Sequence, residues 1–293
     1  MALQSVDAAC AWQLVLDSLS QNGATLALPG TDSPALTLGS QDDPSSWTLH
    51  LPATADATRL LSLFLPLCRP LAGEVSQQLV GQLGQSLDGR IATVTGASRF
   101  INGTDGLTHL HRLRAVSDAV VVGAGTAMAD NPRLTVRLAS GPNPVRVVID
   151  RQRRVPPSHN VFNDGQAATL HLVGGELAPD FNMTIPRSGV LEVPCLGDKD
   201  EPLEPAKIKA VLAGFGLRRL FIEGGGVTVS AFLTAGMLDR LHVIVAPMII
   251  GSGRPAFSLP EIENLDYALR PANQMVNLGS DMLFDLDLTP VRA

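Results

Sequence analysis

The chain has few cysteines, and their placement excludes disulfide-bonded and zinc-binding classes of protein. Its 293 residues include 3 cysteines, Cys10, Cys68 and Cys195, which are far apart and odd in number. A disulfide framework needs paired cysteines, so we expect reduced thiols and a cytoplasmic location. No C-x-x-C occurs and no histidines have the spacing of zinc ligands, so we expect no metal site.

Long hydrophobic runs and an excess of basic residues are also absent. The longest apolar run, residues 60–67, is interrupted by Ser62 and Pro66 and is too short to span a bilayer. No basic segment precedes an apolar run at the N-terminus, so we expect neither a secretory signal nor a membrane anchor. With 22 Lys and Arg against 28 Asp and Glu, the net charge is −6. This balance argues against a nucleic-acid-binding protein.

The P-loop and the G-x-G-x-x-G motif of dinucleotide-binding folds are missing too. The sequence has instead LFIEGGGVT at 220–228, a strand that ends at Glu223, followed by Gly224, Gly225 and Gly226 and the start of a helix. Bare N–H groups at a helix N-terminus bind anions, and glycines let a phosphate approach the backbone. Open α/β sheets bind ligands at this end of their strands. The segment therefore predicts a phosphate-bearing ligand beside a carboxylate, with a plain tight turn as the alternative.

The first 75 residues differ from the rest. Two helical patterns, Val6–Leu19 and Ala55–Leu67, flank a stretch rich in Gly, Pro, Asp and Ser and a short strand at 47–51. No chemical constellation occurs there, so we predict an N-terminal extension over residues 1–75, for packing or support of a dimer, and a second domain over 76–293.

From Leu79 onward, strand and helix patterns alternate. Hydrophobic runs without polar alternation indicate strands that are covered on both faces, and thus a parallel sheet. The expected strands are 79–87, 90–95, 119–123, 144–150, 169–173, 190–193, 219–222, 241–250 and 282–288, and the expected helices are 107–117, 206–215 and 227–235. The last two strands lack an intervening helix long enough for a parallel crossover, so we expect an antiparallel edge.

Two further features have competing interpretations. Asp88-Gly89 is a strong hairpin signal between two strands. Arg112, Arg114, Arg133 and Arg137 lie close in sequence, and the planar guanidinium suits phosphate oxygens. For any one of these arginines, a solvated surface position is the alternative.

A series of short motifs in one order carries a family resemblance. They are SLDGR (86–90), TG (95–96) with Ser98, Phe100 and Ile101, LR (113–114), VGAGT (122–126), ADNP (129–132), LTVR (134–137), VVID (147–150), EGGG (223–226), L-x-x-G-x-x-D (233–239) and AP (246–247), with Gly251 after them. Over roughly residues 79–288 the chain resembles the pyrimidine reductase of riboflavin biosynthesis, which occurs free-standing or as the C-terminal half of a bifunctional deaminase/reductase.

The resemblance implies an α/β, dihydrofolate-reductase-like three-layer fold, NADPH as hydride donor and a homodimer. It implies a uracil substrate with a 5-phosphoribosylamino group, whose ribose C1′ is reduced to give a ribityl chain. By motif, the substrate contacts would be Ser98, Arg114, Leu134, Arg137 and Glu223, with Arg114 and Arg137 on the phosphate. The NADPH contacts would be Gly84, Phe100, Thr126, Asp130, Gly224, Gly225, Gly226, Val227 and Thr228. Asp88 and Glu223 would be the carboxylates nearest the chemistry, with water as a competing proton donor.

The sequence departs from the family pattern at three positions. Gln82 stands where a Lys is usual, Phe100 where a Trp is common, and Arg151 where a Ser or Thr is common. Arg151, followed by Arg153 and Arg154, would pair with the 2′-phosphate of NADPH or face solvent. Gln82 leaves two alternatives open: a reductase of another pyrimidine or pterin, and a nucleotide-binding protein without catalysis.

A deaminase half is not expected in this sequence. A zinc deaminase needs H-x-E and P-C-x-x-C. No H-x-E occurs, and Pro194-Cys195 is followed by Asp198 where the second cysteine would stand.

Overall fold

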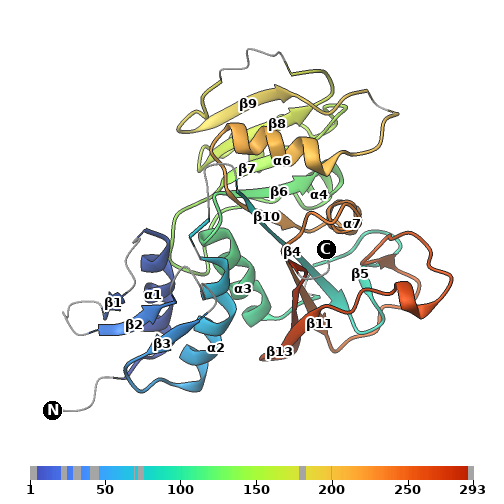
Figure 1. The fold of residues 1–293 in the computed structure, drawn as a ribbon. Helices are drawn as coiled ribbons and strands as arrows, with labels where there is room; N and C mark the ends of the chain where they lie inside the picture. The colour runs from blue at the N-terminus through green and yellow to red at the C-terminus, as the bar shows by residue number, and fades with distance from the viewer. Residues whose placement is uncertain are drawn as a thin grey trace. The chain divides into compact units, whose positions relative to one another are not determined.

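The computed structural model describes residues 5–20, 25–28, 34–39, 46–68, 70–71, 76–99, 101–177, 183–198 and 200–289. The chain divides into two compact units, Met1–Glu74 and Val75–Ala293 (Figure 1).

The N-terminal unit consists of two helices and a small antiparallel sheet. Its elements are α1 (Ala8–Ser20), β1 (Thr25–Ala27), β2 (Pro34–Leu38), β3 (Trp47–Leu49), α2 (Ala55–Phe64) and the short 3-10 helix η1 (Leu65–Leu67). The Thr54 hydroxyl caps α2 by accepting from the Ala57 N–H. Trp12 of α1 packs edge-on against Phe64, with ring centroids 5.2 Å apart. The unit thus has an apolar core of its own.

The larger unit is built on one nine-stranded sheet with the order β13-β14-β11-β4-β10-β6-β7-β8-β9. The strands from β11 to β9 are parallel, whereas β14 and β13 run antiparallel to β11. The strands are β4 (Gln78–Ser86), β6 (Ala119–Gly123), β7 (Val145–Ile149), β8 (Ala168–Val173), β9 (Gly189–Pro194), β10 (Arg219–Glu223), β11 (Arg240–Ala246), β13 (Ala272–Leu278) and β14 (Asp281–Asp287). The predicted parallel sheet with an antiparallel edge is confirmed.

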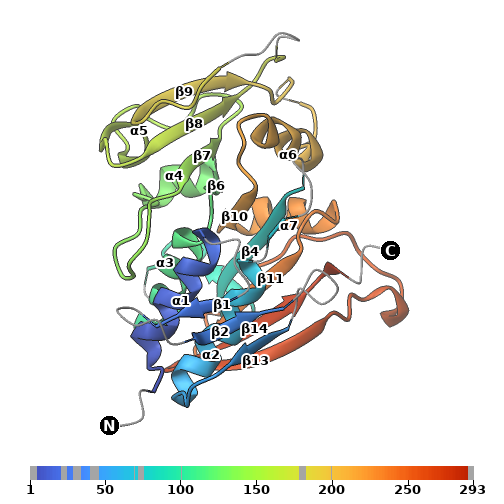
Figure 2. The same cartoon turned by 60° about the vertical axis from the view of Figure 1, so that its left-hand side comes forward.

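Helices lie on both faces of this sheet (Figure 2). They are α3 (Thr104–Ala115), α4 (Ala124–Asp130), α5 (Asn160–Asn163), α6 (Pro205–Gly214) and α7 (Gly226–Thr234), together with the 3-10 helix η2 (Leu265–Tyr267). On one face, Leu212 of α6 and Phe232 of α7 join strand residues such as Leu79 and Ile222 in the apolar core. On the opposite face, α3 contacts the sheet through polar bonds from His109 and Arg114. The three layers follow from strands that are apolar on both faces.

One predicted pairing is wrong. The Asp88-Gly89 turn forms, with the Gly89 N–H 3.0 Å from the Ser86 carbonyl oxygen, but β5 (Arg90–Ala92) does not pair with β4. It pairs antiparallel with β12 (Arg254–Pro255). The reason is that β4 is central and already paired on both edges, by β10 and by β11.

In the larger unit, α4, α5, β12, η2 and β13 were not predicted, and β11 was predicted too long. The helix α4 has only 7 residues and ends at Asn131, whose left-handed φ of 41° terminates it. The strand β13 is largely exposed and lacks a clear apolar pattern. β11 ends at Ala246 and not at Ile250.

Candidate functional site

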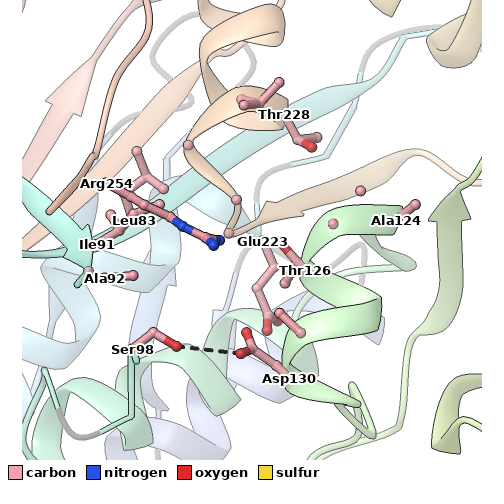
Figure 3. Close-up of a pocket in the computed structure, with 18 of the residues that line it drawn as sticks. Leu83, Ile91, Ala92, Ser98, Ala124, Thr126, Asp130, Glu223, Thr228 and Arg254 are labelled. Atoms are coloured by element: carbon pink, nitrogen blue, oxygen red, sulfur yellow. Dashed lines mark hydrogen bonds between the residues drawn. The ribbon is translucent and has the colours of Figure 1, made fainter. Parts of the chain in front are cut away.

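A cavity of about 1080 Å³ opens at the C-terminal ends of four parallel strands, β4, β10, β6 and β7 (Figure 3). Among the residues that line it are Gly84, Ser98, Thr126, Asp130 and Arg151. The glycine-rich loop after β10 and the first turn of α7 line it as well, from Glu223 to Thr228. Most of the sequence-predicted site residues are therefore brought together in one place, at the sheet edge where α/β folds bind ligands.

The glycine-rich loop is built from unusual backbone conformations. Gly224 and Gly225 have φ values of 61° and 72°, in the left-handed region that glycine tolerates. Gly226 begins α7, and a Cβ there would lie 2.4 Å from the carbonyl oxygen of Ala256. N–H groups in the first turn of a helix have no acceptor within the helix. The loop thus presents backbone donors to the cavity in a conformation that side chains would block.

The loops after β6 and β10 interlock beside the cavity. A Cβ at Gly225 would lie 2.6 Å from the Thr126 hydroxyl, and one at Gly123 would lie 2.5 Å from the Thr228 hydroxyl. Gly84, on β4, leaves room in the same way for the side chain of Asn102, whose Oδ1 would be 1.7 Å from an added Cβ. These close approaches explain why small residues occupy the floor of the cavity.

Glu223 is held by Arg114, a residue of α3. The Arg114 Nε and Nη2 atoms donate to the two carboxylate oxygens of Glu223 at 2.7 and 2.6 Å, and Nη1 donates to the Thr135 carbonyl at 2.9 Å. The Arg114 side chain is 5% exposed and does not line the cavity, whereas Glu223 does. The bidentate pair fixes the Glu223 carboxylate, and the phosphate role of Arg114 stays a prediction.

Asp130 faces Ser98 across the cavity (Figure 3). The Ser98 hydroxyl lies 3.4 Å from Asp130 Oδ1. Burial raises the pKa of the Asp130 carboxyl, and the Glu223 charge adds to the rise, while Ser98 and Arg99 oppose it. A carboxyl with a raised pKa in a ligand cavity is suited to hold and deliver a proton.

The segment after α4 carries the predicted phosphate-binding arginine. Arg137 donates to the Thr135 carbonyl oxygen at 3.2 Å and to its hydroxyl at 2.8 Å. Burial lowers the pKa of Arg137, and the positive charges of Arg114 and Arg133 lower it further. Arg133, Leu134 and Arg137 are not among the residues that line the cavity. Leu134, in the same segment, is buried and has a φ of 56°, so its backbone is strained.

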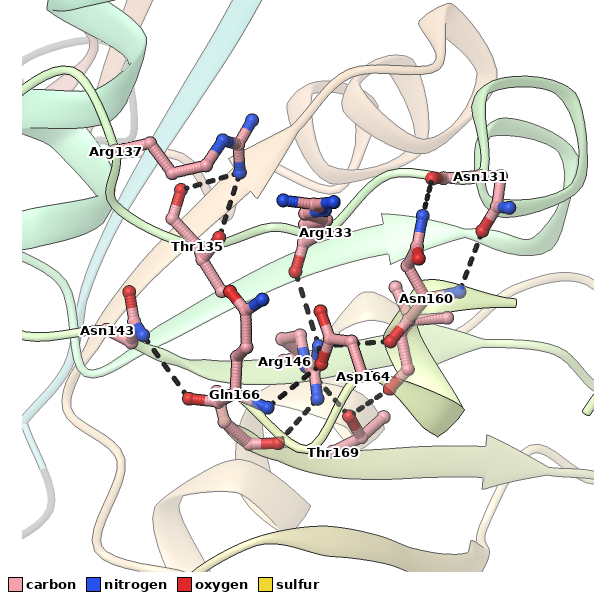
Figure 4. A network of polar contacts seen from close by, with 12 residues as sticks. Asn131, Arg133, Thr135, Arg137, Asn143, Arg146, Asn160, Asp164, Gln166 and Thr169 are labelled. Atoms are coloured by element: carbon pink, nitrogen blue, oxygen red, sulfur yellow. Dashed lines mark hydrogen bonds and ion pairs between the residues drawn. The ribbon is translucent and has the colours of Figure 1, made fainter. Parts of the chain in front are cut away.

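A buried arginine, Arg146, joins this segment to neighbouring strands and loops through a hydrogen-bond network (Figure 4). The Arg146 guanidinium donates to Asp164 Oδ1 at 2.6 Å, to the Ala167 carbonyl at 2.5 Å and to the Arg133 carbonyl at 3.4 Å. Asn160 and Asn131 join the same network through two bonds, of 2.7 and 2.8 Å. The network anchors the backbone at Arg133, so the nearby arginines are presented from a rigid base.

Asp88 lies outside the cavity lining. Its carboxylate accepts from the Ser86 hydroxyl at 2.5 Å and from the Ile250 and Gly251 N–H groups at 3.1 and 2.6 Å. These hydrogen bonds, led by that of Ser86, lower the pKa of Asp88 to about 2. A carboxylate that is ionised and already bonded fits a turn-stabilising role better than the predicted catalytic one. Phe100, predicted to contact the cofactor, lies outside the described residues.

Many residues that line the cavity were not predicted as site residues, among them Arg254, Gln152 and Arg154. Arg254 extends into it from β12 (Figure 3), while Gln152 and Arg154 line the end near β7. The position of Arg254 depends on the pairing of β12 with β5, between residues 92 and 254, which no local pattern reveals. Arg154 had a signal, since three arginines lie within 151–154, but the sequence did not show which one faces the cavity.

The described parts of the chain were searched for clusters of metal-ligating side chains and for helices of membrane-spanning length. No group of three or more His, Cys, Asp or Glu among them is placed to hold a metal ion. None of the helices described is both long and apolar enough to cross a bilayer.

The chain has close relatives among characterised families. The RibD C-terminal domain family matches residues 78–284. The 2,5-diamino-6-ribosylamino-4(3H)-pyrimidinone 5′-phosphate reductase of Methanothermobacter thermautotrophicus is 38% identical over 207 residues, which cover 68% of this chain and 93% of the relative. The riboflavin biosynthesis protein RibD of Aquifex aeolicus is 31% identical over 68% of this chain, but only 54% of its own length is matched.

Solved structures agree in fold. RibD of Acinetobacter baumannii has a TM-score of 0.60 at 23% identity, covering 81% of this chain and 65% of that chain. The Thermotoga maritima diaminohydroxyphosphoribosylaminopyrimidine deaminase/5-amino-6-(5-phosphoribosylamino)uracil reductase has a TM-score of 0.58 at 25% identity, covering 81% and 64%. The chain thus spans somewhat less than two thirds of these longer proteins, and the predicted reductase fold is confirmed. The chain belongs to the RibD C-terminal domain family.

Proposed function

We propose that the chain is a reductase of riboflavin biosynthesis, which uses NADPH to reduce C1′ of a 5′-phosphorylated ribosylaminopyrimidine to a ribityl chain. The observation that carries the proposal is a single cavity with a glycine-rich helix N-terminus at one wall and the Glu223 and Asp130 carboxylates at another. The residues that line it all fall within 82–258. We therefore assign the activity to residues 76–293, with residues 1–75 as an extension.

The cavity fits a nicotinamide dinucleotide. The left-handed Gly224 and Gly225 and the close packing of Gly226 form a cradle that a Cβ would fill. At this cradle a pyrophosphate would accept hydrogen bonds from first-turn N–H groups of α7. Thr126 and Thr228, from the interlocked loops, would add hydroxyl donors. When bound, the nicotinamide supplies a hydride.

The segment after α4, whose arginines lie outside the cavity lining, would bind the phosphate of the sugar. Arg133 and Arg137 share one rigid segment, and the pKa of Arg137 is lowered by burial and by the neighbouring arginines. A phosphate dianion would relieve this repulsion and accept charge-assisted bonds from Arg137. Binding energy gained at this remote group orients the reacting carbon.

The carboxylates would then have different tasks. Glu223, fixed by Arg114 at 2.6 and 2.7 Å, would accept bonds from substrate N–H or hydroxyl groups. Asp130, whose pKa is raised chiefly by burial, would hold a proton near the nitrogen or oxygen on C1′ as negative charge develops there. Apolar neighbours such as Leu83 and Ile91, which line the same cavity, would help to keep water from the reacting atoms.

Gln82 bears on which pyrimidine is used. It lines the cavity, is 6% exposed, and its Oε1 atom has no hydrogen-bond partner among the described residues. A buried carbonyl acceptor of this kind favours an N–H donor on the ligand. The named substrate of the Methanothermobacter relative carries a 2-amino group, whereas that of the Thermotoga protein is a uracil. We propose that the 2,5-diamino compound is the better substrate and that the uracil is the second candidate.

The test is NADPH oxidation, followed by absorbance, with each of the two pyrimidines and with dihydrofolate. Oxidation with one or both ribosylaminopyrimidine phosphates and none with dihydrofolate supports the proposal. Tight NADPH binding without turnover of any of them would indicate a nucleotide-binding protein instead. For the substrate choice, Gln82→Leu should lose the preference for the diamino compound; an unchanged preference would rule out Gln82 as its source.

We also propose that two copies of the chain associate and act in the cytoplasm. β13 is the terminal strand of the sheet, and Met275 on it is 66% exposed. Met282 of β14 and Ile249 are exposed apolar side chains in the same unit, at 37% and 76%. An edge strand with exposed apolar side chains is suited to pair with a second copy. The three cysteines are free thiols, which fits a reducing compartment.

A further inference from the structure

We infer that Arg154 binds the 2′-phosphate of the cofactor, in a subsite for an adenosine 2′-phosphate at the β7 end of the cavity. The inference rests on the proposed function, because it names the residue that makes the site prefer NADPH to NADH. Three arginines, Arg151, Arg153 and Arg154, follow β7 within four positions. Their surroundings differ, and the differences single out Arg154.

The turn that carries these arginines is fixed by one buried carboxylate. Asp150 is 1% exposed. Its Oδ1 accepts from the Arg154 N–H at 2.9 Å, and its Oδ2 accepts from the Val155 N–H at 2.8 Å. His171 Nε2 lies 3.2 Å from the same Oδ2. The backbone at position 154 is therefore held in place before any ligand binds, which lowers the entropic cost of using its side chain.

Arg151 is engaged elsewhere. Its guanidinium donates to the backbone carbonyl of Glu201 and, at 3.1 Å, to that of Pro202. These bonds tie the turn to the segment that leads into Leu203 and α6. We therefore assign Arg151 a positioning role: it holds the Leu203 wall of the cavity, although its own side chain also lines that space.

Arg153 is engaged on the surface. Its backbone has a φ of 53°, in the left-handed region, and it does not line the cavity. Nε and Nη2 donate to the two carboxylate oxygens of Glu192 at 3.1 and 2.6 Å. Both side chains of this pair are about half exposed, at 51% and 48%. Because its guanidinium is already paired with Glu192 at the surface, we assign Arg153 no contact with the ligand.

Arg154 is the remaining arginine. It is exposed, it lines the cavity, and no acceptor in the described part of the chain contacts its guanidinium. Its backbone N–H is bonded to Asp150, so its contribution to a ligand is the guanidinium alone. A phosphate monoester carries about 1.5 to 2 negative charges at pH 7 and three acceptor oxygens, which match this planar donor group.

The wall beside Arg154 is apolar. Ile149 and Leu196, which are 8% and 6% exposed, line the same end of the cavity with Leu203. An apolar slot next to a cation suits a flat aromatic base that carries an anion nearby, because the base buries its surface while the phosphate stays hydrated at the rim. The adenosine 2′-phosphate of NADPH has this combination, and the adenosine of NADH lacks the anion.

The experiment compares dissociation constants of NADPH, NADH, 2′,5′-ADP and 5′-ADP for the full-length protein and three alanine variants. Arg154→Ala should weaken NADPH and 2′,5′-ADP about tenfold or more, which corresponds to about 1.4 kcal/mol, and leave NADH and 5′-ADP nearly unchanged. Arg153→Ala, the matched control on the same turn, should change none of the four. Arg151→Ala should weaken all four ligands alike, since it disturbs the wall and not the phosphate contact.

The outcomes separate this inference from the proposed function. If the wild type prefers NADPH and Arg154→Ala keeps that preference, the assignment of Arg154 is wrong while the reductase proposal stands. If Arg151→Ala loses the preference instead, the 2′-phosphate belongs to Arg151. If the wild type binds none of the four ligands, the proposed cofactor itself is wrong.

Discussion

Two carboxylates share the cavity, and their surroundings assign them different tasks. Glu223 is clamped by two hydrogen bonds from Arg114, of 2.7 and 2.6 Å. Asp130 has a single long contact with Ser98, of 3.4 Å, and burial raises its pKa. A fixed carboxylate suits substrate positioning, and a carboxyl with a raised pKa suits proton transfer.

We predict that Asp130→Asn lowers kcat by about 10² to 10⁴, the range typical for loss of a general acid. In the wild type, kcat should fall as the pH rises through the pKa of Asp130, because the ionised form has no proton to give. Steady-state kinetics across pH should show this basic limb in the wild type and not in Asp130→Asn.

Ser98→Ala provides the matched control for this residue. The Ser98 hydroxyl lowers the pKa of Asp130, so its removal should move the basic limb to higher pH while most of kcat remains. An Asp130→Asn variant that retains both kcat and the basic limb would assign the proton to water or to another group.

Residue roles could be predicted from sequence where they depend on local backbone, and not where they depend on distant partners. The glycines at 224–226 and the acid before them were placed correctly in the cavity, because a strand-to-helix turn is a local event. The pairing of Arg114 with Glu223 could not be predicted, because the two residues lie 109 positions apart. The hydrogen bonds that Asp88 accepts from Ile250 and Gly251 could not be predicted either, because they come from a loop more than 160 residues later.

Among the elements, the glycine-rich loop with α7 is the part of the fold that the cofactor proposal depends on most. Gly226 lies against the segment before Ser258, where a Cβ would meet the Ala256 and Pro255 carbonyl oxygens at 2.4 and 3.0 Å. Backbone atoms of this kind cannot rotate away from the added methyl group.

We predict that Gly226→Ala shifts the start of α7 and weakens NADPH binding at least about tenfold, since the backbone donors no longer converge on the phosphate. The dissociation constant of NADPH and the urea unfolding curve measure the two effects. Gly214→Ala is the control, because this glycine ends α6 and has nothing within 4 Å of an added Cβ. This substitution should reduce neither the affinity for NADPH nor the stability in urea. Undiminished NADPH affinity in Gly226→Ala would remove the loop from the cofactor site.

A polar row across five neighbouring strands was beyond prediction from sequence. Glu223, Gln82, His242, Asp285 and Gln274 are register partners on β10, β4, β11, β14 and β13. The helix α3 contacts this row through Arg114 on Glu223 and through His109, whose Nε2 is 2.9 Å from His242 Nδ1. Each strand was recognised by its apolar residues, but the row exists only once the register is set.

At the scale of the whole molecule, buried titratable groups make stability depend on pH. Burial lowers the pKa of His109 well below its ordinary value, and burial with the Arg114 and Arg137 charges lowers that of His111 to about 4. Burial alone would raise the pKa of Asp285, but hydrogen bonds and charge from His242 and Arg240 bring it below its ordinary value.

The directions of these pKa shifts predict that the folded protein loses stability as the pH falls. Below about pH 6.5, His109 and His111 become protonated in the unfolded chain but stay neutral in the folded chain. The free energy of unfolding therefore falls as the pH falls, by up to about 1.4 kcal/mol per pH unit for each histidine. Asp285 adds its loss only below its unfolded pKa of about 3.9. We predict a lower free energy of unfolding at pH 5 than at pH 7, measured in urea.

His111→Gln should reduce the difference between the two pH values, and His159→Gln serves as a control outside this cluster. Equal unfolding free energies of the wild type at pH 7 and pH 5 would contradict the assignment of buried, neutral histidines.

Association of two copies is the second property of the whole molecule that we predict. Met275 and Met282 are exposed on the antiparallel edge of the sheet, where a charge would oppose burial against a second copy. Light scattering coupled to gel filtration should give the mass of a dimer for the wild type and of a monomer for Met275→Glu with Met282→Glu. A wild-type monomer at the concentration of the kinetic assays would refute the proposed dimer.

The central claim, that this cavity delivers a hydride from NADPH to C1′ of a phosphorylated ribosylaminopyrimidine, is tested most directly with labelled cofactor. NADPH carrying deuterium at the transferring position of nicotinamide C4 is incubated with enzyme and substrate, and the product is examined by mass spectrometry and NMR. We predict one deuterium per product molecule, bound at C1′ of the ribityl chain. A product without deuterium, or with deuterium on the pyrimidine ring, would contradict the account.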